Sequence, residues 1–275
     1  MESTQQYKQI IQQAFDMVAP GYDHPALSFF PKTAANMLQQ LNLKGDLHLL
    51  DVCTGTGMVA LAAAEQLPQG KVTGIDLSSG MLQRAQEKAA QKGLSNTRFI
   101  QMDLDHLELD NNSFDVVTSS FGLFFLEDMQ TALSNIVATV KPGGRVAISS
   151  FTGNAFDPFS QIFLDRYQSF GKEIPNLSWK RLAMPENISV LFEAAGLGDI
   201  QYHHIPLGYD IESPQQWWDV VWNAGYRGML NQLTVEQQEQ FKQQHFEEIT
   251  ALLKDGKVWM ETEVILAIGH KANEH

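Results

Sequence analysis

One short stretch, residues 49–57, constrains the fold of this chain more than any other. Its apolar run ends in an acid, Asp51, and a turn that contains two glycines comes directly after it. Residues 58–66 then have the composition of a helix, and a second apolar run ends in another acid, Asp76. The order of strand, glycine turn, helix, strand and acid is typical of a nucleotide-cofactor site at the edge of a parallel sheet.

Two kinds of cofactor fit this order. Residues 55–60 match the dinucleotide pattern G-x-G-x-x-[G/A], and Asp76 lies at about the 20-residue distance expected of an acid that binds ribose hydroxyls. Asp51 argues against a dinucleotide, because a carboxylate at the mouth of the turn would repel a pyrophosphate at the helix N-terminus. S-adenosylmethionine carries a sulfonium and an ammonium group, which the same carboxylate would attract. The charge of Asp51 therefore favours S-adenosylmethionine and leaves an NAD-dependent oxidoreductase as the alternative.

Strands and helices alternate along the first half of the chain. We expect N-terminal helices at 5–18 and 31–41, strands at 47–52, 72–75, 99–102, 114–120 and 145–151, and further helices at 80–92 and 128–140. Residues 141–144, Lys-Pro-Gly-Gly, are typical of a turn between the last of these helices and its strand. Alternation of this kind predicts an α/β fold, with a doubly wound and mostly parallel sheet that carries helices on both faces.

Four segments of this region, taken together, resemble a known family. They are residues 15–23, the glycine turn at 49–57, residues 119–123 (Ser-Ser-Phe-Gly-Leu) and residues 140–145 (Val-Lys-Pro-Gly-Gly-Arg). The set is similar to the ubiquinone/menaquinone biosynthesis methyltransferase family, within the class I S-adenosylmethionine-dependent methyltransferases, over about residues 10–151. The resemblance implies a methyl-transferring enzyme with a Rossmann-like core. Cys53 departs from the pattern, because many class I enzymes have glycine at this first position of the turn.

The alternation stops after residue 151, and the resemblance guides the interpretation of the remaining residues. Class I enzymes end in an antiparallel pair of strands, for which 198–205 and 260–269 are the candidates. Residues 1–151 are then the cofactor-binding core with its N-terminal helices, residues 152–258 a helical and aromatic substrate cap inserted around strand six, and residues 259–275 the last strand and a tail. The expected sheet has seven strands, of which the last is antiparallel.

The composition excludes several classes of partner. The net charge is −13 and Lys and Arg total only 19, whereas nucleic-acid binding needs a basic surface. No cluster of Asp, Glu and His has metal-site spacing, and the single cysteine excludes an intramolecular disulfide. There is no apolar run of about 18 residues and no basic-then-apolar leader. We therefore expect a cytoplasmic protein with a small-molecule substrate, no metal, no nucleic-acid partner and no stable membrane insertion. Any oligomer would form through the cap.

The candidate cofactor residues all lie at expected carboxyl ends of strands, where open α/β sheets bind ligands. Asp76 is expected to accept hydrogen bonds from both ribose hydroxyls, Asp103 to accept from the adenine amino group, and Asp51 to attract the cationic end of the cofactor. Gly55 and Gly57 are expected to let the backbone approach the cofactor closely. The whole predicted set is Tyr22, Asp51, Cys53, Thr54, Gly55, Thr56, Gly57, Asp76, Leu77, Met81, Met102, Asp103, Leu104, Ser120 and Phe121.

The acceptor and any catalytic base are less constrained. Methyl transfer is an in-line displacement, so most of the work lies in holding the nucleophile about 3 Å from the methyl carbon. A base is needed only where the nucleophile is protonated, and His24, His203 and His204 are the candidates near the expected site. A cofactor-binding protein without catalytic activity is a third possibility, because class I enzymes share no single catalytic residue.

The cap is rich in aromatic residues. Trp218, Trp222 and Tyr226 recur at intervals of four, which predicts that they share one helix face. Such a face packs on the core or lines an apolar pocket, and the second role suits an aromatic or lipid-like acceptor. The sequence therefore favours O- or C-methylation of a small apolar or aromatic molecule.

Overall fold

The main sheet of the protein has seven strands in the order β3-β2-β1-β4-β5-β9-β6. The structure, a computed structural model, describes residues 2–273. The strands are β1 His48–Val52, β2 Lys71–Asp76, β3 Thr97–Gln101, β4 Phe114–Ser120, β5 Val140–Phe151, β6 Leu197–Pro206 and β9 Glu263–Lys271. β9 runs antiparallel to both neighbours, while β1 to β5 pair in parallel. The predicted doubly wound, mostly parallel seven-stranded sheet with an antiparallel last strand is confirmed.

The central strands are apolar because helices cover them on both faces. Leu49, Leu50 and Val52 of β1 are fully buried, and Val116 and Val117 of β4 are nearly so. Near-continuous apolar runs of this kind are typical of internal parallel strands. β1 pairs with β2 on one side and with β4 on the other, so the strand order reverses there. A crevice for ligands is expected at the carboxyl ends of these strands.

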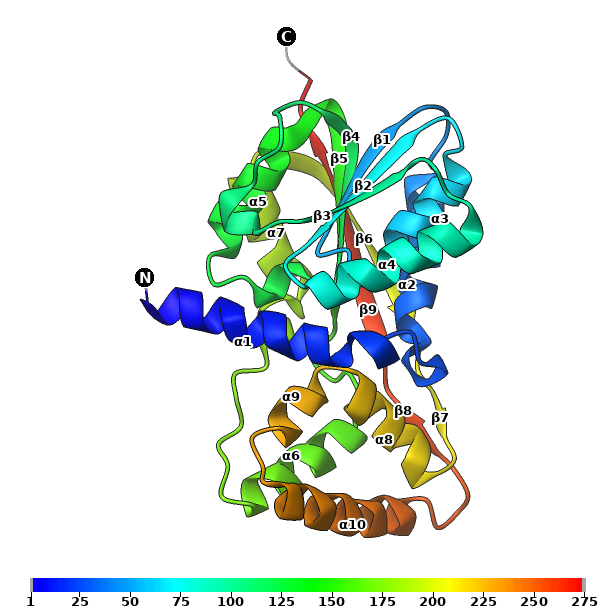
Figure 1. Cartoon of the computed structure of the whole chain (residues 1–275), viewed down its shortest axis with the longest axis vertical. Helices are drawn as coiled ribbons and strands as arrows, with labels where there is room; N and C mark the ends of the chain where they lie inside the picture. Colours follow the sequence, from blue (N-terminus) through cyan, green and yellow to red (C-terminus); the bar gives the residue numbers. More distant parts are fainter. Residues whose placement is uncertain (1, 274–275) are drawn as a thin grey trace.

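The α-helices of the described chain include those that cover both faces of the sheet. They are α1 Glu2–Val18, α2 Phe29–Leu41, α3 Met58–Gln66, α4 Ser79–Lys92, α5 Met129–Thr139, α6 Phe159–Ser169, α7 Pro185–Ala194, α8 Pro214–Asn223, α9 Tyr226–Leu230 and α10 Val235–Leu252. Figure 1 shows α3 and α4 on one side of the sheet and α5 and α7 on the other. α7 contacts α5, β6 and β9, so part of the segment 152–258 packs on the sheet as a core helix.

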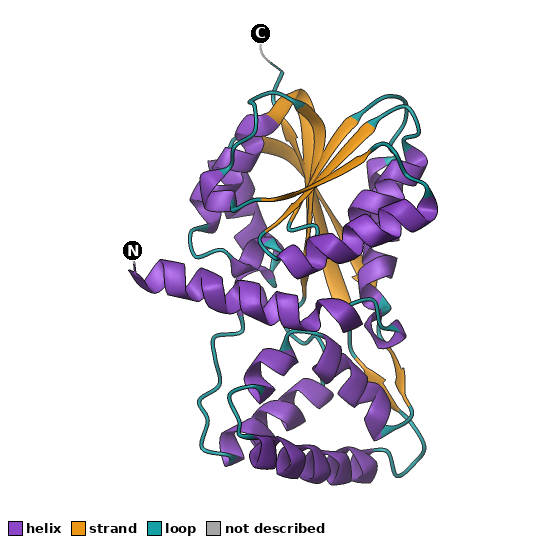
Figure 2. Ribbon diagram, in the orientation of Figure 1, coloured by secondary structure: helices purple, strands orange, loops and turns teal. Residues whose placement is uncertain are grey.

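The remaining helices of that segment form a second layer beyond the sheet. α6, α8, α9 and α10, here called the lower bundle, lie past the carboxyl ends of the parallel strands, and α1 crosses between them and the sheet (Figure 2). A small antiparallel pair, β7 Tyr209–Ile211 and β8 Val258–Met260, accompanies the bundle. The interior of the lower bundle is aromatic, with Phe163, Trp217 and Phe241 fully buried.

Two sequence predictions about local structure are wrong. Residues 141–144 do not separate a helix from a strand, because β5 begins at Val140 and its pairing with β4 shifts register across them. Gly143 has φ +74° in this irregularity, a conformation that suits glycine. The turn-forming residues therefore interrupt the strand as an insertion rather than precede it.

The second error concerns the aromatic repeat in the cap. α8 ends at Asn223, and Ala224 is extended, so Tyr226 begins a different helix, α9. Trp218 and Trp222 do stack on α8, with ring centroids 6.2 Å apart. Tyr226 instead lies against Phe163 and Trp217 inside the lower bundle. The two residues between the helices, Ala224 and Gly225, turn the chain so that this ring leaves the predicted face.

Candidate functional site

A cavity opens at the carboxyl ends of β1 to β4, and α1 contributes to its lining. Figure 1 shows α1 crossing this end of the sheet. It collects residues from the loops after β1, β2, β3 and β4, together with side chains of α1 and of the 3-10 helix η4, Leu123–Phe125. Every member of the predicted cofactor set except Gly57 lines this cavity. Residues spread over about a hundred positions of sequence thus meet at the edge where the strand-end argument places them.

The turn after β1 owes its shape to left-handed residues. Cys53, Gly55 and Gly57 have φ of +54°, +55° and +80°. A side chain on Gly55 would meet no atom within 4 Å, so open space adjoins this backbone. Gly57 differs: a Cβ there would lie 3.0 Å from the Cβ of Ala85 on α4. Contrary to the prediction, Gly57 serves helix packing behind the turn and does not line the cavity.

The turn also packs tightly against the exit of β4. Phe121 has φ +58°, and Gly122 is the next residue. A Cβ on Gly122 would lie 2.3 Å from the Cβ of Cys53, an impossible distance. Cys53 fits at the first position of the turn because Gly122, which lies against it, has no side chain.

Asp51 is a buried carboxyl at the base of the cavity, with 1% of its surface exposed. Its Oδ2 accepts a hydrogen bond from the Thr54 hydroxyl at 2.6 Å, and its Oδ1 accepts from the Thr118 hydroxyl at 2.7 Å. Burial raises the pKa of Asp51 to about 6, although both hydroxyls oppose the rise. The two threonines fix the carboxyl in place as a negative group that faces the cavity.

Asp76 is held by backbone amides at the end of β2. Its Oδ2 accepts from the Gly55 N–H at 2.8 Å and its Oδ1 from the Ser78 N–H at 2.9 Å. Burial raises the pKa of Asp76, and these N–H groups limit the rise. Each oxygen keeps further acceptor capacity, so the carboxylate can receive two hydroxyls of a vicinal diol at once.

Asp103 has a partner that the sequence did not reveal. Its Oδ2 lies 2.6 Å from the Nζ of Lys8 on α1, and its Oδ1 accepts from the Asp105 N–H at 3.0 Å. Burial alone would raise the pKa of Asp103, but the hydrogen bonds from Lys8 and Asp105 hold it below its usual value. The carboxyl is therefore ionised and already attached to the helix that covers the cavity.

The cavity lining also includes a mainly apolar set of residues, here called the aromatic wall. α1 contributes Tyr7, Ile11, Gln12 and Phe15, and η4 and its following residue contribute Phe125 and Leu126. Phe15 meets Phe125 edge-on, with centroids 5.2 Å apart. These residues were not predicted as site residues. For the apolar residues of α1, the periodic apolar face of the first helix was the one signal that pointed to them.

Tyr22 joins the two sides of the cavity. Its ring stacks on Phe30 with centroids 5.0 Å apart and meets Phe15 edge-on at 6.2 Å. Burial, together with the nearby carboxylates of Asp76 and Asp23, raises the pKa of its phenol. Tyr22 therefore stays protonated at neutral pH and is a hydrogen-bond donor as well as an aromatic surface.

The three candidate bases do not line the cavity. His24 caps the 3-10 helix η2, Pro25–Leu27, where its Nδ1 accepts from the Ala26 N–H at 3.2 Å. His203 and His204 lie on β6, the edge strand farthest from β3, and His204 faces Glu263. The sequence predicts strand six at the correct residues, but it does not reveal how far this edge strand lies from the loops that line the cavity.

Two further features bear on the class of site. Within residues 2–273, no three His, Cys, Asp or Glu side chains are grouped so as to hold a metal ion. No helix of the described chain is long and apolar enough to cross a bilayer.

The cavity residues suit S-adenosylmethionine. Asp76 offers two acceptor oxygens for a ribose diol, and the open space beside Gly55 leaves backbone free for close approach. The buried Asp51 at the turn disfavours phosphates and favours a cation. These acidic acceptors and the open backbone thus fit a cationic, phosphate-free nucleoside cofactor.

Comparisons with known proteins agree with this geometry. Residues 49–144 match the family model described as methyltransferase domain. A demethylmenaquinone methyltransferase of Lactiplantibacillus plantarum is 28% identical over 224 residues, which cover 74% of this chain and 93% of that protein. A protein of the same name from Listeria monocytogenes is 28% identical over 72% of this chain and 92% of its own length.

The fold has solved counterparts at lower identity. The YcgJ protein of Bacillus subtilis superposes with a TM-score of 0.61 at 20% identity, over 88% of this chain and 99% of that one. The superposition extends well past the matched domain, so the similarity of fold includes segments that come after β5.

Proposed function

We propose that the chain is an S-adenosylmethionine-dependent methyltransferase whose acceptor is a small apolar or aromatic molecule that receives the methyl group on oxygen or carbon. The matched domain, the fold and the relatives all support the predicted cofactor. Neither the oxidoreductase nor the non-catalytic cofactor-binding protein gains support from any observation.

One observation carries the proposed acceptor class: the part of the cavity lining that comes from α1 and from η4 with the residue after it is mainly apolar and aromatic. Ile11, Phe15, Phe125 and Leu126 form most of it. The side chain of Arg181 holds this wall in place, because its guanidinium donates to the backbone carbonyls of η4 and the residues after it. A flat, uncharged ring is the ligand that such a surface stabilises best.

The relatives narrow the class further. Those at 28% identity carry the name demethylmenaquinone methyltransferase, which refers to a quinone-type acceptor. We carry over only that class, because the aromatic wall supports it independently. Among the described residues that line the cavity there is no histidine. We therefore favour an acceptor with an acidic hydroxyl or an electron-rich ring carbon, which needs little help from a base.

The residues of this chain contribute mainly binding and orientation. When bound, S-adenosylmethionine supplies a methyl group made electrophilic by its sulfonium. Asp76 would hold the ribose hydroxyls and Asp51 the cationic end, so both fix the position of the donor. The apolar wall excludes water and holds a planar acceptor in one orientation, and positioning of this kind lowers the barrier for in-line transfer.

The test is a product screen with methyl-labelled S-adenosylmethionine. Purified protein is incubated with a reduced naphthoquinone, a simple phenol, phosphoethanolamine and sarcosine, and both S-adenosylhomocysteine and product masses are measured. We expect label in at least one aromatic compound and none in the two amines. Transfer to the amines alone would contradict the proposed acceptor class. Cofactor binding without transfer to any compound would favour the non-catalytic alternative.

A further inference from the structure

The N-terminal strap, defined as residues 2–24, is attached to each of the three loops that bind the cofactor. The strap comprises α1 and the 3-10 helix η1, Ala19–Gly21. One polar side chain of the strap reaches the loop after β1, a second the loop after β2, and a third the loop after β3. The strap therefore covers the cofactor loops as a unit.

The first two attachments lie at the C-terminal end of the strap. Asp23 accepts from the Thr56 hydroxyl at 2.8 Å and from Lys88 at 2.7 Å. Asp16 accepts from the Ser78 hydroxyl at 2.5 Å and from the Gly80 N–H at 2.9 Å. The latter contact caps the N-terminus of α4 from outside.

The third attachment lies nearer the start of the strap. The ammonium of Lys8 lies 2.6 Å from Asp103 Oδ2 and 2.5 Å from Asp105 Oδ2. Burial lowers the pKa of Lys8, but its hydrogen bonds to the two carboxylates raise it overall, so the pair is ionised at neutral pH. This ion pair ties the first half of α1 to the loop after β3.

The two ends of α1 are held very differently. At the C-terminal end, Val18 and Ala19 are buried against Met81 of α4. At the N-terminal end, residues around Lys8 are exposed, and Ile10 keeps 53% of its surface in solvent. An element fixed at one end by buried packing and at the other by an ion pair opens at the ion pair first.

Opening at that end uncovers the cofactor site. Tyr7, Lys8, Ile11 and Phe15 of α1 all line the cavity, so the first half of the helix is its roof. Asp103, the predicted acceptor for the adenine amino group, is the same carboxyl that holds Lys8. Its oxygens can accept more than the two hydrogen bonds they have, so a bound adenine would add to the Lys8 contact rather than replace it.

We propose that Lys8 is a positioning residue: with Asp103 and Asp105 it forms a releasable latch that holds α1 closed over the bound cofactor. The latch opens for the cofactor to enter and for its demethylated product to leave. Closure of the same helix completes the acceptor wall through Ile11 and Phe15, so the cofactor binds before the acceptor. This inference rests on the cofactor assignment.

The test measures how fast S-adenosylhomocysteine dissociates from immobilised protein by surface plasmon resonance. Lys8→Met removes the ion pair, and the expected dissociation rate is about fivefold faster, the upper range for a partly exposed pair. Lys8→Arg keeps the charge and should restore the slow rate. Lys92→Met is the matched control, because Lys92 pairs with Glu65 at 2.6 Å on the exposed surface outside the cavity.

Hydrogen exchange supplies a second measurement on the same proteins. In the wild type, S-adenosylhomocysteine should slow exchange at the amides of residues 5–17, and Lys8→Met should lose most of that protection. Unchanged or slower release from Lys8→Met, or equal acceleration by Lys92→Met, would overturn the latch while the cofactor assignment stands. A wild type that binds no S-adenosylhomocysteine would overturn the assignment and the latch together.

Discussion

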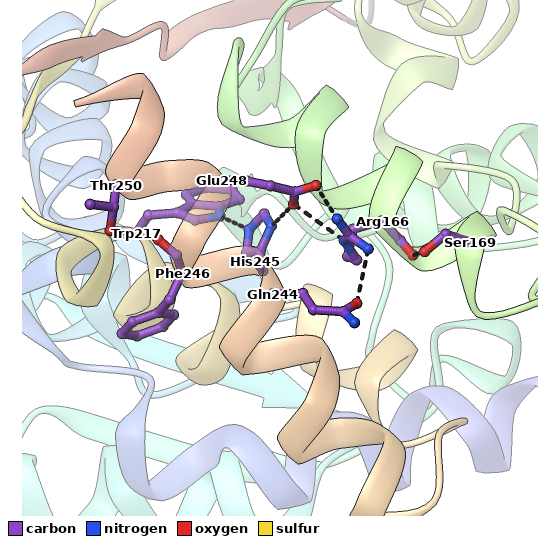
Figure 3. Close-up of polar contacts among 8 residues, drawn as sticks. All are labelled: Arg166, Ser169, Trp217, Gln244, His245, Phe246, Glu248 and Thr250. Carbon is purple, nitrogen blue, oxygen red and sulfur yellow. Dashed lines mark hydrogen bonds and ion pairs between the residues drawn. The ribbon is translucent and has the colours of Figure 1, made fainter. Parts of the chain in front are cut away.

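The indole Nε1–H of Trp217 donates a hydrogen bond to His245 Nε2 over 2.8 Å inside the lower bundle. Figure 3 shows this pair joining α8 to α10, with Glu248 beyond it bound to Arg166 of α6. Because Nε2 accepts, the imidazole is neutral and carries its proton on Nδ1, which faces Glu248 Oε2 at 3.3 Å. One neutral histidine thus links three helices of the bundle.

This arrangement predicts loss of stability in mild acid. Burial lowers the pKa of His245 to about 4, although Glu248 opposes the shift. A histidine with a lowered folded pKa stabilises the fold fully above its unfolded value of 6.5, and the contribution disappears as pH falls toward 4. The loss should reach at most about 3 kcal/mol.

Urea unfolding at several pH values checks this expectation. His245→Gln keeps an acceptor for Trp217 without a titrating group, so its stability relative to the wild type should improve steadily between pH 6.5 and 4. His204→Gln, at a half-exposed histidine, should follow the wild type. If the difference in unfolding free energy between the wild type and His245→Gln stays constant across this range, His245 is not the source of the acid sensitivity.

The cofactor half of the site was predictable because its signals are local. Asp51, Asp76 and Asp103 each lie directly after an apolar strand, and parallel topology brings such positions to one edge. Nothing beyond strand order was needed to place them. Gly57 failed within the same motif because a glycine required for packing and one required for ligand approach look alike in sequence.

The rest of the site depends on contacts between distant residues. Lys8 and Asp103 are 95 positions apart, and no periodic pattern in the sequence predicts that they pair. Isolated histidines carry no positional information, so His203 was assigned to a site several strands away. The aromatic repeat misled for a third reason: Gly225 is the only helix-breaking residue between α8 and α9, and a single glycine within a helical pattern does not by itself predict a break.

We expect the substitution Asp51→Asn to weaken cofactor binding and to raise the free energy of unfolding. Burial raises the pKa of this carboxyl from 3.8 to about 6, so its charge costs about 3 kcal/mol of folding free energy at pH 7. A folded pKa above the unfolded value means that stability is lost as pH rises from 3.8 to 6. The amide can still bond to Thr54 and Thr118.

We therefore expect Asp51→Asn to be more stable than the wild type at pH 7 and equal to it near pH 4. Its affinity for S-adenosylmethionine, measured by calorimetry, should fall at least about tenfold because the cationic end loses its counter-charge. Full affinity in the amide variant would show that Asp51 has no role in attracting the cofactor.

Asp76→Ala tests the diol-binding carboxyl. The substitution removes the acceptor for two ribose hydroxyls, and calorimetry should show S-adenosylmethionine affinity weakened by at least about tenfold, roughly 1.4 kcal/mol. It also leaves the N–H groups of Gly55 and Ser78 without their partner, so some thermal stability should be lost. Asp46→Ala, at an exposed loop acid, should change neither quantity. Unchanged affinity in a folded Asp76→Ala protein would remove Asp76 from the site.

Gly122→Ala should disrupt the cavity floor, and a second substitution should repair it. The added methyl would lie 2.3 Å from the Cβ and 2.9 Å from the Sγ of Cys53. We expect the single variant to melt several degrees lower and to bind the cofactor poorly. Cys53→Gly removes both clashing atoms and suits the positive φ of this position, so the double variant should regain binding. If the double variant binds the cofactor no more tightly than Gly122→Ala, the clash with Cys53 is not the cause of the lost binding.

Adjacent isoleucines on α1 provide a matched test of the acceptor wall. Ile11 lines the cavity, whereas Ile10 faces solvent with 53% of its surface exposed. Ile11→Ala removes apolar contact with the acceptor, so KM for an aromatic acceptor should rise about five- to tenfold, corresponding to roughly 1 kcal/mol of buried methyl and methylene groups.

Ile10→Ala makes the same chemical change on the same helix and should leave KM unaltered. Because Ile10 does not line the cavity, Ile10→Ala should also bind S-adenosylmethionine with affinity close to that of the wild type. Equal KM values for the two variants would mean that the acceptor does not rest against α1, and the aromatic wall would then be part of the core rather than of the substrate site.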